Sequence, residues 1–423
     1  MSHNSRKQTH ARNTVYNALG EGLWGFGMAF HNIHAVVPVF LAELGAEPWL
    51  IGLVPGGFVL ILALPQLASA VLFRNVTDIK RLNIIGHFAV IPFLIGMVWF
   101  FFVQQLTGPN AILIYMILYV SYAISIGFLV PVWADFLASV TIPHKRGRFF
   151  GITFTSNAIF GMAGGYFLKL ILENDSYSFP ANFGFGWLIM TVAIFVGTTI
   201  FMLMKVLQPP VPVVDEETRW LKRTLAIYAR DVNFRRYIYS RMFSAAAFMP
   251  LAFYAIDLQQ RYDLPLSSSG TFTFFLVLGT AIFNYLLGYL GDTAGRKYSV
   301  AFFYIGNILA MLVALFLHAP WTAYLVFLFV GLSFGASQSS FMVFIYEFAG
   351  EGGDRKLYYA ALETAVAPVL FVFISIAGTL VEFFGYMTLY ALSLGLVGAG
   401  LLVLVLGVQA PAALASEEDL IST

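Results

Sequence analysis

Six ionisable side chains stand within stretches that are otherwise apolar over about 20 residues, the length that crosses a bilayer as a helix. They are Glu21, His31, His34, Arg241, Asp257 and Glu363. A charge at the bilayer centre costs roughly 2.5–3.5 kcal/mol or more, so a residue kept there is a functional candidate. Because a buried carboxyl can take up and release a proton, we expect Glu21, Glu363 and Asp257 to take part in proton coupling.

Each of these carboxyls also has a structural alternative. Glu21 and Glu363 could hydrogen-bond to a neighbouring helix. Asp257 and Arg261 stand four residues apart, which favours a local ion pair at an outer gate or on the surface. Arg241 lies near the inner end of the same segment and could extend its guanidinium to the interface.

The first apolar segment contains a polar stripe if it is a continuous helix. At about 100° per residue, Asn17 and Asn32 fall within about 40° of Glu21, while His31 is about 80° away. His34 is about 140° away and could face another helix. We expect Asn32, His31 and His34 to line a substrate cavity, and the alternative for the histidines is a structural hydrogen bond.

Further neutral polar side chains extend this predicted cavity lining to other segments. They are Gln66, Tyr119, Tyr122, Asn157, Tyr254, Asn284 and Gln338. Tyr115, Tyr119 and Tyr122 share one face of the fourth segment. An aromatic stripe of this kind either packs between helices or contacts a ligand, and both possibilities remain open for these tyrosines.

The composition indicates a protein surrounded by lipid. Of 423 residues, 59% are hydrophobic and 11% are charged, whereas soluble domains carry about 25% charged residues. The absence of cysteine excludes disulfides and thiolate metal sites, and a net charge of +1 argues against a nucleic-acid partner. No nucleotide-binding loop, zinc-protease motif or nucleophile elbow occurs, so we expect no enzyme activity, cofactor or metal.

Windows of about 20 residues predict an all-α membrane protein with twelve transmembrane helices. The predicted spans are 14–42, 49–73, 83–106, 110–138, 149–173, 186–207, 237–261, 268–291, 298–318, 321–348, 357–383 and 386–408. They form two six-helix halves, 14–207 and 237–408. Between the halves lies a cytoplasmic linker, 208–236, with an amphipathic helix, and a cytoplasmic tail, 409–423, follows the second half.

Basic residues predict the orientation of these spans. Of the 23 Lys and Arg residues, only Lys169 and Arg261 fall near predicted outer ends. Because Lys and Arg concentrate in cytoplasmic loops, we predict a multi-pass protein of the cell inner membrane with both termini in the cytoplasm.

The two halves share a charged turn after their second segment. In the second half it reads Gly288-Tyr-Leu-Gly-Asp292-Thr-Ala-Gly295-Arg296-Lys297, and residues 73–81 of the first half keep only Asp78, Lys80 and Arg81 of this pattern. This turn, with twelve spans and a central linker, resembles the major facilitator superfamily. The resemblance covers about residues 14–408 and implies two pseudo-symmetric six-helix bundles.

Charges at the inner ends of the segments predict two cytoplasmic gates. One would pair Lys80, Arg81 or Arg148 with Asp135, beside Asp78. The gate of the second half would pair basic side chains with Glu347, and its predicted members are Asp292, Arg296, Lys297, Glu347 and Arg355. The alternative is that these charges are solvated and only set the topology.

The resemblance implies a monomeric secondary transporter that works by alternating access on a small-molecule substrate within the lipid bilayer. An aromatic content of 17% with few fixed charges favours an amphiphilic substrate, coupled to protons and exported. Uptake of a small organic acid is an alternative, because Glu21-Gly22-Leu23-Trp24-Gly25-Phe26 is similar to a monocarboxylate-transporter pattern. Alternatives of another class are a lipid scramblase and a non-transporting membrane sensor.

Overall fold

The computed structural model describes residues 3–73, 76–142, 145–207, 226–349 and 355–411, and their regular secondary structure is entirely helical. This confirms the all-α class. Residues 208–225 of the predicted linker and 412–423 of the predicted tail lie outside the described residues.

The chain divides into two compact units. Unit 1 comprises Met1–Glu47, Val54–Val214 and Asp263–Phe274, and unit 2 comprises Pro48–Leu53, Asp215–Tyr262 and Phe275–Thr423.

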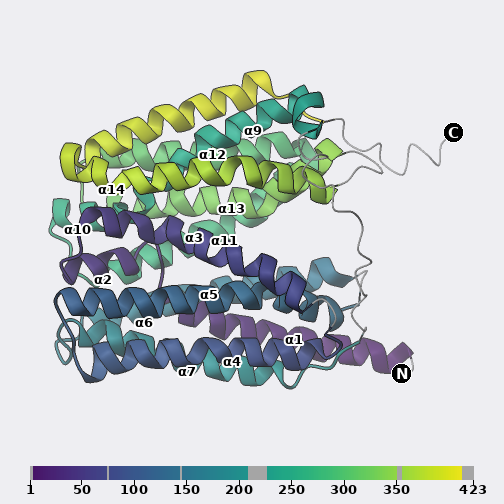
Figure 1. The fold of residues 1–423 in the computed structure, drawn as a ribbon, viewed down its shortest axis with the longest axis horizontal. Coiled ribbons are helices and arrows are strands. Elements are labelled where there is room, and N and C mark those ends of the chain that lie inside the picture. The colour runs from purple at the N-terminus through teal and green to yellow at the C-terminus, as the bar shows by residue number, and fades with distance from the viewer. Residues whose placement is uncertain (1–2, 74–75, 143–144, 208–225, 350–354, 412–423) are drawn as a thin grey trace. The chain divides into compact units, whose positions relative to one another are not determined.

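The helices of the first half run from α1 to α7 (Figure 1). Their bounds are α1 His3–Ala29, α2 Val37–Glu43, α3 Pro48–Leu72, α4 Ile79–Met97, α5 Pro109–Ser139, α6 Arg146–Leu172 and α7 Ala181–Phe201. A π-helical turn, Val98–Val103, extends α4. Within unit 1, α1 packs along α6 and α7, and α4 packs along α5 and α7.

The helices of the second half begin with a broken segment. Their bounds are α9 Val232–Ser244, α10 Tyr254–Tyr262, α11 Ser268–Ala294, α12 Arg296–Phe316, α13 Thr322–Ala349 and α14 Arg355–Leu402. Two 3-10 turns, Ala245–Phe248 and Pro250–Ala252, connect α9 to α10, and a π-helical turn, Val403–Gly407, extends α14. Within unit 2, α12 packs along α13, and α14 packs along α9 and α12.

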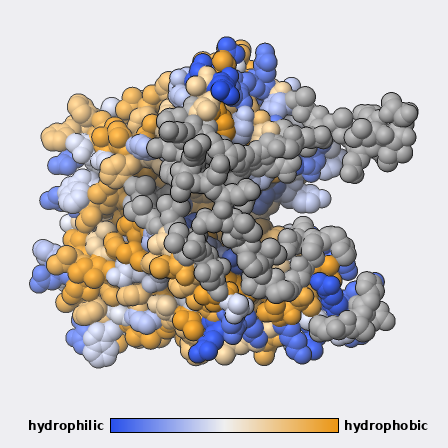
Figure 2. All heavy atoms as spheres, turned by 45° about the vertical axis from the view of Figure 1, so that its right-hand side comes forward, coloured by the Kyte–Doolittle hydropathy of each residue, from blue (hydrophilic) through white to orange (hydrophobic). Residues whose placement is uncertain are grey.

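Seven of the described helices are long and apolar enough to cross a membrane, or eight if the bent α9–α10 pair is one span. The last of these helices covers both predicted spans 357–383 and 386–408. Gly385 separates the two, because its φ of 77° interrupts the helical backbone. Large apolar side chains such as Leu406 and Phe383 are mostly exposed, and Figure 2 shows hydrophobic residues over much of the visible surface. The protein is therefore a multi-pass membrane protein.

The predicted continuous helix over 14–42 is wrong. The helix begins at His3, ends at Ala29 and resumes at Val37. In the gap, Asn32 Oδ1 accepts the backbone N–H groups of His34 at 2.9 Å and Ala35 at 3.0 Å. An Asn side chain that satisfies nearby backbone donors competes with the helix, so Asn32 does not share a helical stripe with Glu21.

The predicted helix over 237–261 is also interrupted. Its two parts are bent by 43° where the 3-10 turns meet α10. Pro250 lies in this break and has no backbone N–H to donate to the preceding turn, which explains why the α-helix does not continue. The first segment of each predicted half is therefore broken within its length.

Glycine sets how closely α1 and α6 pack. A Cβ at Gly164 of α6 would collide with the carbonyl oxygen of Phe26 and lie 2.8 Å from the Cβ of Ala29. Small residues allow such close approach between membrane helices, where van der Waals packing drives association. Gly151, on the same helix, would place a Cβ in open space.

We predict that Gly164→Ala lowers the thermal stability of the purified protein by about 1–3 kcal/mol, because overpacking forces α1 and α6 apart. Gly151→Ala is the matched control, and we expect it to leave stability unchanged or slightly raised. Thermal unfolding in detergent measures both. Equal transitions for the two variants would contradict the close α1–α6 contact.

Candidate functional site

Glu21 lies buried on α1, where α5 and α6 both contribute to its surroundings. The indole Nε1 of Trp133, on α5, donates a hydrogen bond of 2.5 Å to Glu21 Oε1. The side-chain amide of Asn157, on α6, donates to the backbone carbonyl of Glu21 at 2.9 Å. The side chain of Glu21 therefore has a neutral donor, and no cation pairs with it among the described residues.

Further polar bonds fix α1 against α6 on the N-terminal side of Glu21. Asn17 donates to Thr153 Oγ1 at 2.7 Å, and Ser156 Oγ donates to the carbonyl of Ala18 at 2.6 Å. Asn17 Oδ1 is buried and has no partner within the described part of the chain. A buried polar atom of this kind is a place where water binds.

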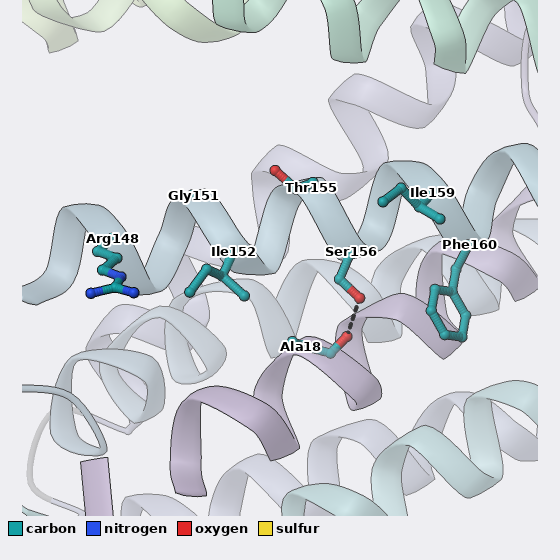
Figure 3. A pocket seen from close by; sticks show the side chains of 8 residues that line it. All are labelled: Ala18, Arg148, Gly151, Ile152, Thr155, Ser156, Ile159 and Phe160. Atoms are coloured by element: carbon teal, nitrogen blue, oxygen red, sulfur yellow. Dashed lines mark hydrogen bonds between the residues drawn. The ribbon is translucent and has the colours of Figure 1, made fainter. Parts of the chain in front are cut away.

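A groove of about 570 Å³ runs along α6 beside these bonds. Figure 3 shows Arg148 at one end, Phe160 at the other, and Ser156 directed toward Ala18. The remaining lining residues are Gly151, Ile152, Thr155 and Ile159. Ligand pockets measure about 300–1,000 Å³ and are mostly apolar with a few polar groups, and this groove fits that description.

His31 occupies a packed aromatic cluster in unit 1. Its Nε2 is 2.9 Å from the hydroxyl of Tyr115, and its ring contacts Tyr119, Tyr122 and Trp187. All five side chains are at most 1% exposed. The structure thus brings three predicted cavity residues, His31, Tyr119 and Tyr122, together in a buried cluster.

The other predicted cavity residues of the first half lie apart from this cluster. Asn32 caps the backbone at the break after α1, and His34 is half-buried in the same break. Gln66 is half-buried on α3. Asn157 is the predicted cavity residue that bonds to Glu21 itself.

Asp257 forms the predicted i,i+4 ion pair with Arg261. The hydroxyl of Tyr390 donates to Asp257 Oδ2 at 2.9 Å, and Tyr254 stacks on Tyr390 with ring centroids 5.1 Å apart. Arg261 also donates to the carbonyl of Ala314 at 2.5 Å. Asp257 is 4% exposed, so its carboxylate is buried.

Asn284 and Gln338, predicted from different segments, are neighbours. The amide of Asn284 on α11 donates to Gln338 Oε1 on α13 at 3.2 Å. Gln338 is exposed, so this pair can reach a ligand or solvent.

The predicted cluster around Asp135 does not form among the described residues. Lys80 Nζ instead donates to the carbonyl of Met202 at 2.7 Å, at the end of α7. The last carbonyls of a helix lack intrahelical partners, so a lysine there is well placed. Asp78 caps α4 by accepting the N–H of Arg81 at 3.0 Å, and Arg148 lines the groove.

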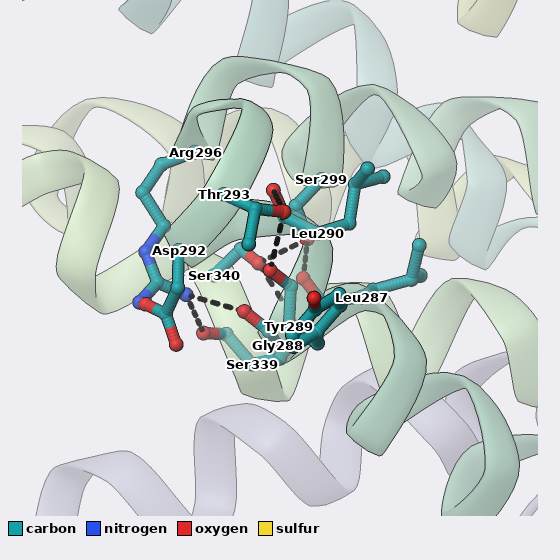
Figure 4. Close-up of polar contacts among 10 residues, drawn as sticks. All are labelled: Leu287, Gly288, Tyr289, Leu290, Asp292, Thr293, Arg296, Ser299, Ser339 and Ser340. Atoms are coloured by element: carbon teal, nitrogen blue, oxygen red, sulfur yellow. Dashed lines mark hydrogen bonds and ion pairs between the residues drawn. The ribbon is translucent and has the colours of Figure 1, made fainter.

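Arg296 pairs with Asp292 and not directly with Glu347 as predicted (Figure 4). It also donates to the carbonyls of Gly288 and Ser339, and its charge acts on Glu347 only at longer range. Asp292 is close because it lies only four residues before Arg296, across the turn at Gly295 between α11 and α12.

Lys297, beside this pair, anchors the end of the last helix, donating to Val405 at 3.0 Å and Val408 at 2.7 Å. The side chain of Arg355 lies outside the described residues.

Trp133 is a site residue that sequence reasoning missed. It stands 112 residues from Glu21, and no local pattern marks it as the partner of that carboxyl. Extension to the interface was one alternative for Arg241, and its guanidinium lies 3.9 Å from the ring centroid of Phe341. The sequence marked Arg241 as a functional candidate because it lies inside a predicted transmembrane span.

Comparison with known proteins places the fold. A family model described as Major Facilitator Superfamily matches residues 176–366. A nucleoside transporter NupG (D323A mutant) structure has 12% identity and a TM-score of 0.68, covering 94% of this chain and 99% of that one.

Two further solved structures are similar. The structure of a D-xylose-proton symporter has 15% sequence identity and a TM-score of 0.68, and the match covers 95% of this chain and 98% of that one. The structure of a peptide transporter POT in complex with sulfate has 13% sequence identity and a TM-score of 0.65, and the match covers 95% of this chain and 96% of that one. No curated protein matches the sequence. At these identities the structures establish the fold and leave the substrate open.

We predict that Asp257→Asn destabilises the protein by about 3 kcal/mol, because it leaves the half-buried Arg261 without its counter-charge. Asp263→Asn, at an exposed position with a φ of 51° that Asn tolerates, is the control and should change little. Thermal unfolding of both variants in detergent measures the difference. A loss no larger than that of the control would mean that the pair contributes nothing to stability.

Proposed function

The chain is a member of the major facilitator superfamily, and we propose that it is a proton-coupled secondary transporter of a small amphiphilic organic compound. The proposal includes twelve transmembrane helices in two six-helix bundles, 14–207 and 237–408. The protein would be a monomer in the inner membrane, with both termini on the cytoplasmic side. Transport follows alternating access, and export is the favoured direction. The family and the similar transporter structures support this class.

The observation that carries the proton coupling is the buried carboxyl of Glu21. Its carboxyl is buried, accepts from the neutral indole of Trp133, and has no cation partner in the described structure. A buried charge without a counter-charge is costly, so this carboxyl is best accommodated dry when it holds a proton. Water that reaches it in another conformation would allow the proton to leave, which is what a carrier requires.

The groove supports the choice of substrate class. Its wall combines aliphatic and aromatic side chains with the hydroxyls of Thr155 and Ser156. Such a lining suits a compound with an apolar body and a few hydrogen-bonding groups. Among the similar structures, one is described as a D-xylose-proton symporter, so proton coupling occurs on this fold.

Asp257 and Glu363 are the other residues proposed to take part in proton coupling, and their surroundings differ. Asp257 already has Arg261 and Tyr390 as partners, which favours a structural role. Glu363 is exposed on α14 and interacts electrostatically with Arg241. Glu21 is therefore the first residue to test.

We predict that Glu21→Gln abolishes accumulation driven by a pH gradient in proteoliposomes, by at least about tenfold, but spares exchange of substrate across the membrane. Glutamine still accepts the Trp133 hydrogen bond yet cannot carry a proton. A radiolabelled panel of nucleosides, sugars, dipeptides and amphiphilic drugs identifies the compound to follow.

Glu43→Gln, an exposed residue at the end of α2, is the matched control and should accumulate substrate like the unmodified protein. Wild-type accumulation by Glu21→Gln would remove Glu21 from the mechanism. If no compound moves but lipid equilibrates between leaflets without a gradient, the scramblase alternative holds instead.

A further inference from the structure

Arg241 is a cation held inside the broken membrane span of unit 2. It lies in the third turn of α9, and its guanidinium stacks over the ring of Phe341 at 3.9 Å and lies 5.3 Å from the ring of Phe303. Aromatic faces stabilise a guanidinium without neutralising its charge. An arginine at this depth is costly and is usually retained for a function.

The guanidinium has fewer partners than it has donors. Arg241 Nη1 donates to Ser244 Oγ at 3.0 Å, and the hydroxyl of Tyr304 is a second partner. Its Nε is buried and has no partner in the described part of the chain. Because arginine presents five N–H donors in a planar fork, this one can still bind an acceptor with two oxygens.

Glu363 is the carboxylate whose charge acts on Arg241, but the two form no ion pair among the described residues. Glu363 is exposed on α14, the helix that packs along α9. The cation and the carboxylate are thus close enough to interact and are not joined. An anionic ligand could form the direct pair with the guanidinium that Glu363 does not form.

Tyrosine hydroxyls complete the surroundings of Arg241. The hydroxyl of Tyr237 is buried without a partner in the described structure, and that of Tyr304 bonds to Ser240 at 2.7 Å. Phenolic hydroxyls donate hydrogen bonds to anions and carry no charge themselves. A single arginine balances one negative charge, so a monoanion fits and a phosphate dianion facing Glu363 does not.

We propose that Arg241 binds the carboxylate of a small monocarboxylate ligand in competition with Glu363. The inference rests on the proposed transport function and deepens it, since the amphiphilic substrate would then carry a carboxylate. The charge of Glu363 competes with the ligand carboxylate for Arg241.

Binding of benzoate to the purified full-length protein in detergent tests this site, with benzamide as the neutral probe of the same shape. Benzoate should raise the thermal transition and benzamide should not. Arg241→Gln should weaken benzoate binding at least tenfold, and Arg241→Lys, which keeps the charge but loses the fork, less so. Arg236→Gln, on the exposed side of α9, should bind benzoate like the unmodified protein.

Glu363→Gln should tighten benzoate binding several-fold, because the competing carboxylate is gone. That result is decisive even if Arg241→Gln does not fold, since a purely structural role of Glu363 predicts no gain. Equal stabilisation by benzoate and benzamide, or weaker benzoate binding by Glu363→Gln, overturns the proposal. Benzoate binding needs no gradient, so its presence without any transport would count against the proposed function alone.

Discussion

A helix that crosses hydrocarbon must satisfy its own backbone polar groups, and the described structure departs from this rule in two comparable places. The segment after α1 is unwound from 30 to 36, and the segment after α9 passes through 3-10 turns. Both breaks are buried in protein, and side chains such as Asn32 satisfy exposed donors. Broken helices in transporters carry binding sites, so the constraint points to where polar chemistry is tolerated.

Each unit holds an ionisable group that has no directly paired counter-charge. In unit 1 the carboxyl of Glu21 has an indole partner and no cation, and in unit 2 the guanidinium of Arg241 has aromatic and hydroxyl partners and no joined carboxylate. Both statements hold for the residues that the structure describes. A buried carboxyl without a cation is stabilised by binding a proton, and a buried guanidinium without a carboxylate is stabilised by binding an anion. Both kinds of binding are steps in transport.

Local features of the sequence predicted local features of the structure. The spacing of Asp257 and Arg261 gave the ion pair, and the apolar segments gave the helical class. Residue type alone selected Asn284 and Gln338, which proved to be neighbours across two helices.

Contacts that depend on helix rotation escaped prediction. Trp133 reaches Glu21 from another helix, and Lys80 bonds to the end of α7 instead of Asp135. Single-sequence periodicity fixes which face a residue shares with its neighbours, but not which helix that face meets. The breaks were missed for a related reason, because Asn32 and Pro250 act through individual hydrogen bonds that hydropathy ignores.

Alternating access at the groove is the central claim, and the natural absence of cysteine makes it directly measurable. Thr155, an exposed residue of the groove, can be replaced by cysteine and reacted with a membrane-impermeant maleimide applied to either side of sealed proteoliposomes that hold a proton gradient. The account predicts that Thr155→Cys reacts from both sides, because the groove opens to each in turn. Reaction from one side only, under every gradient and ligand condition, would contradict it.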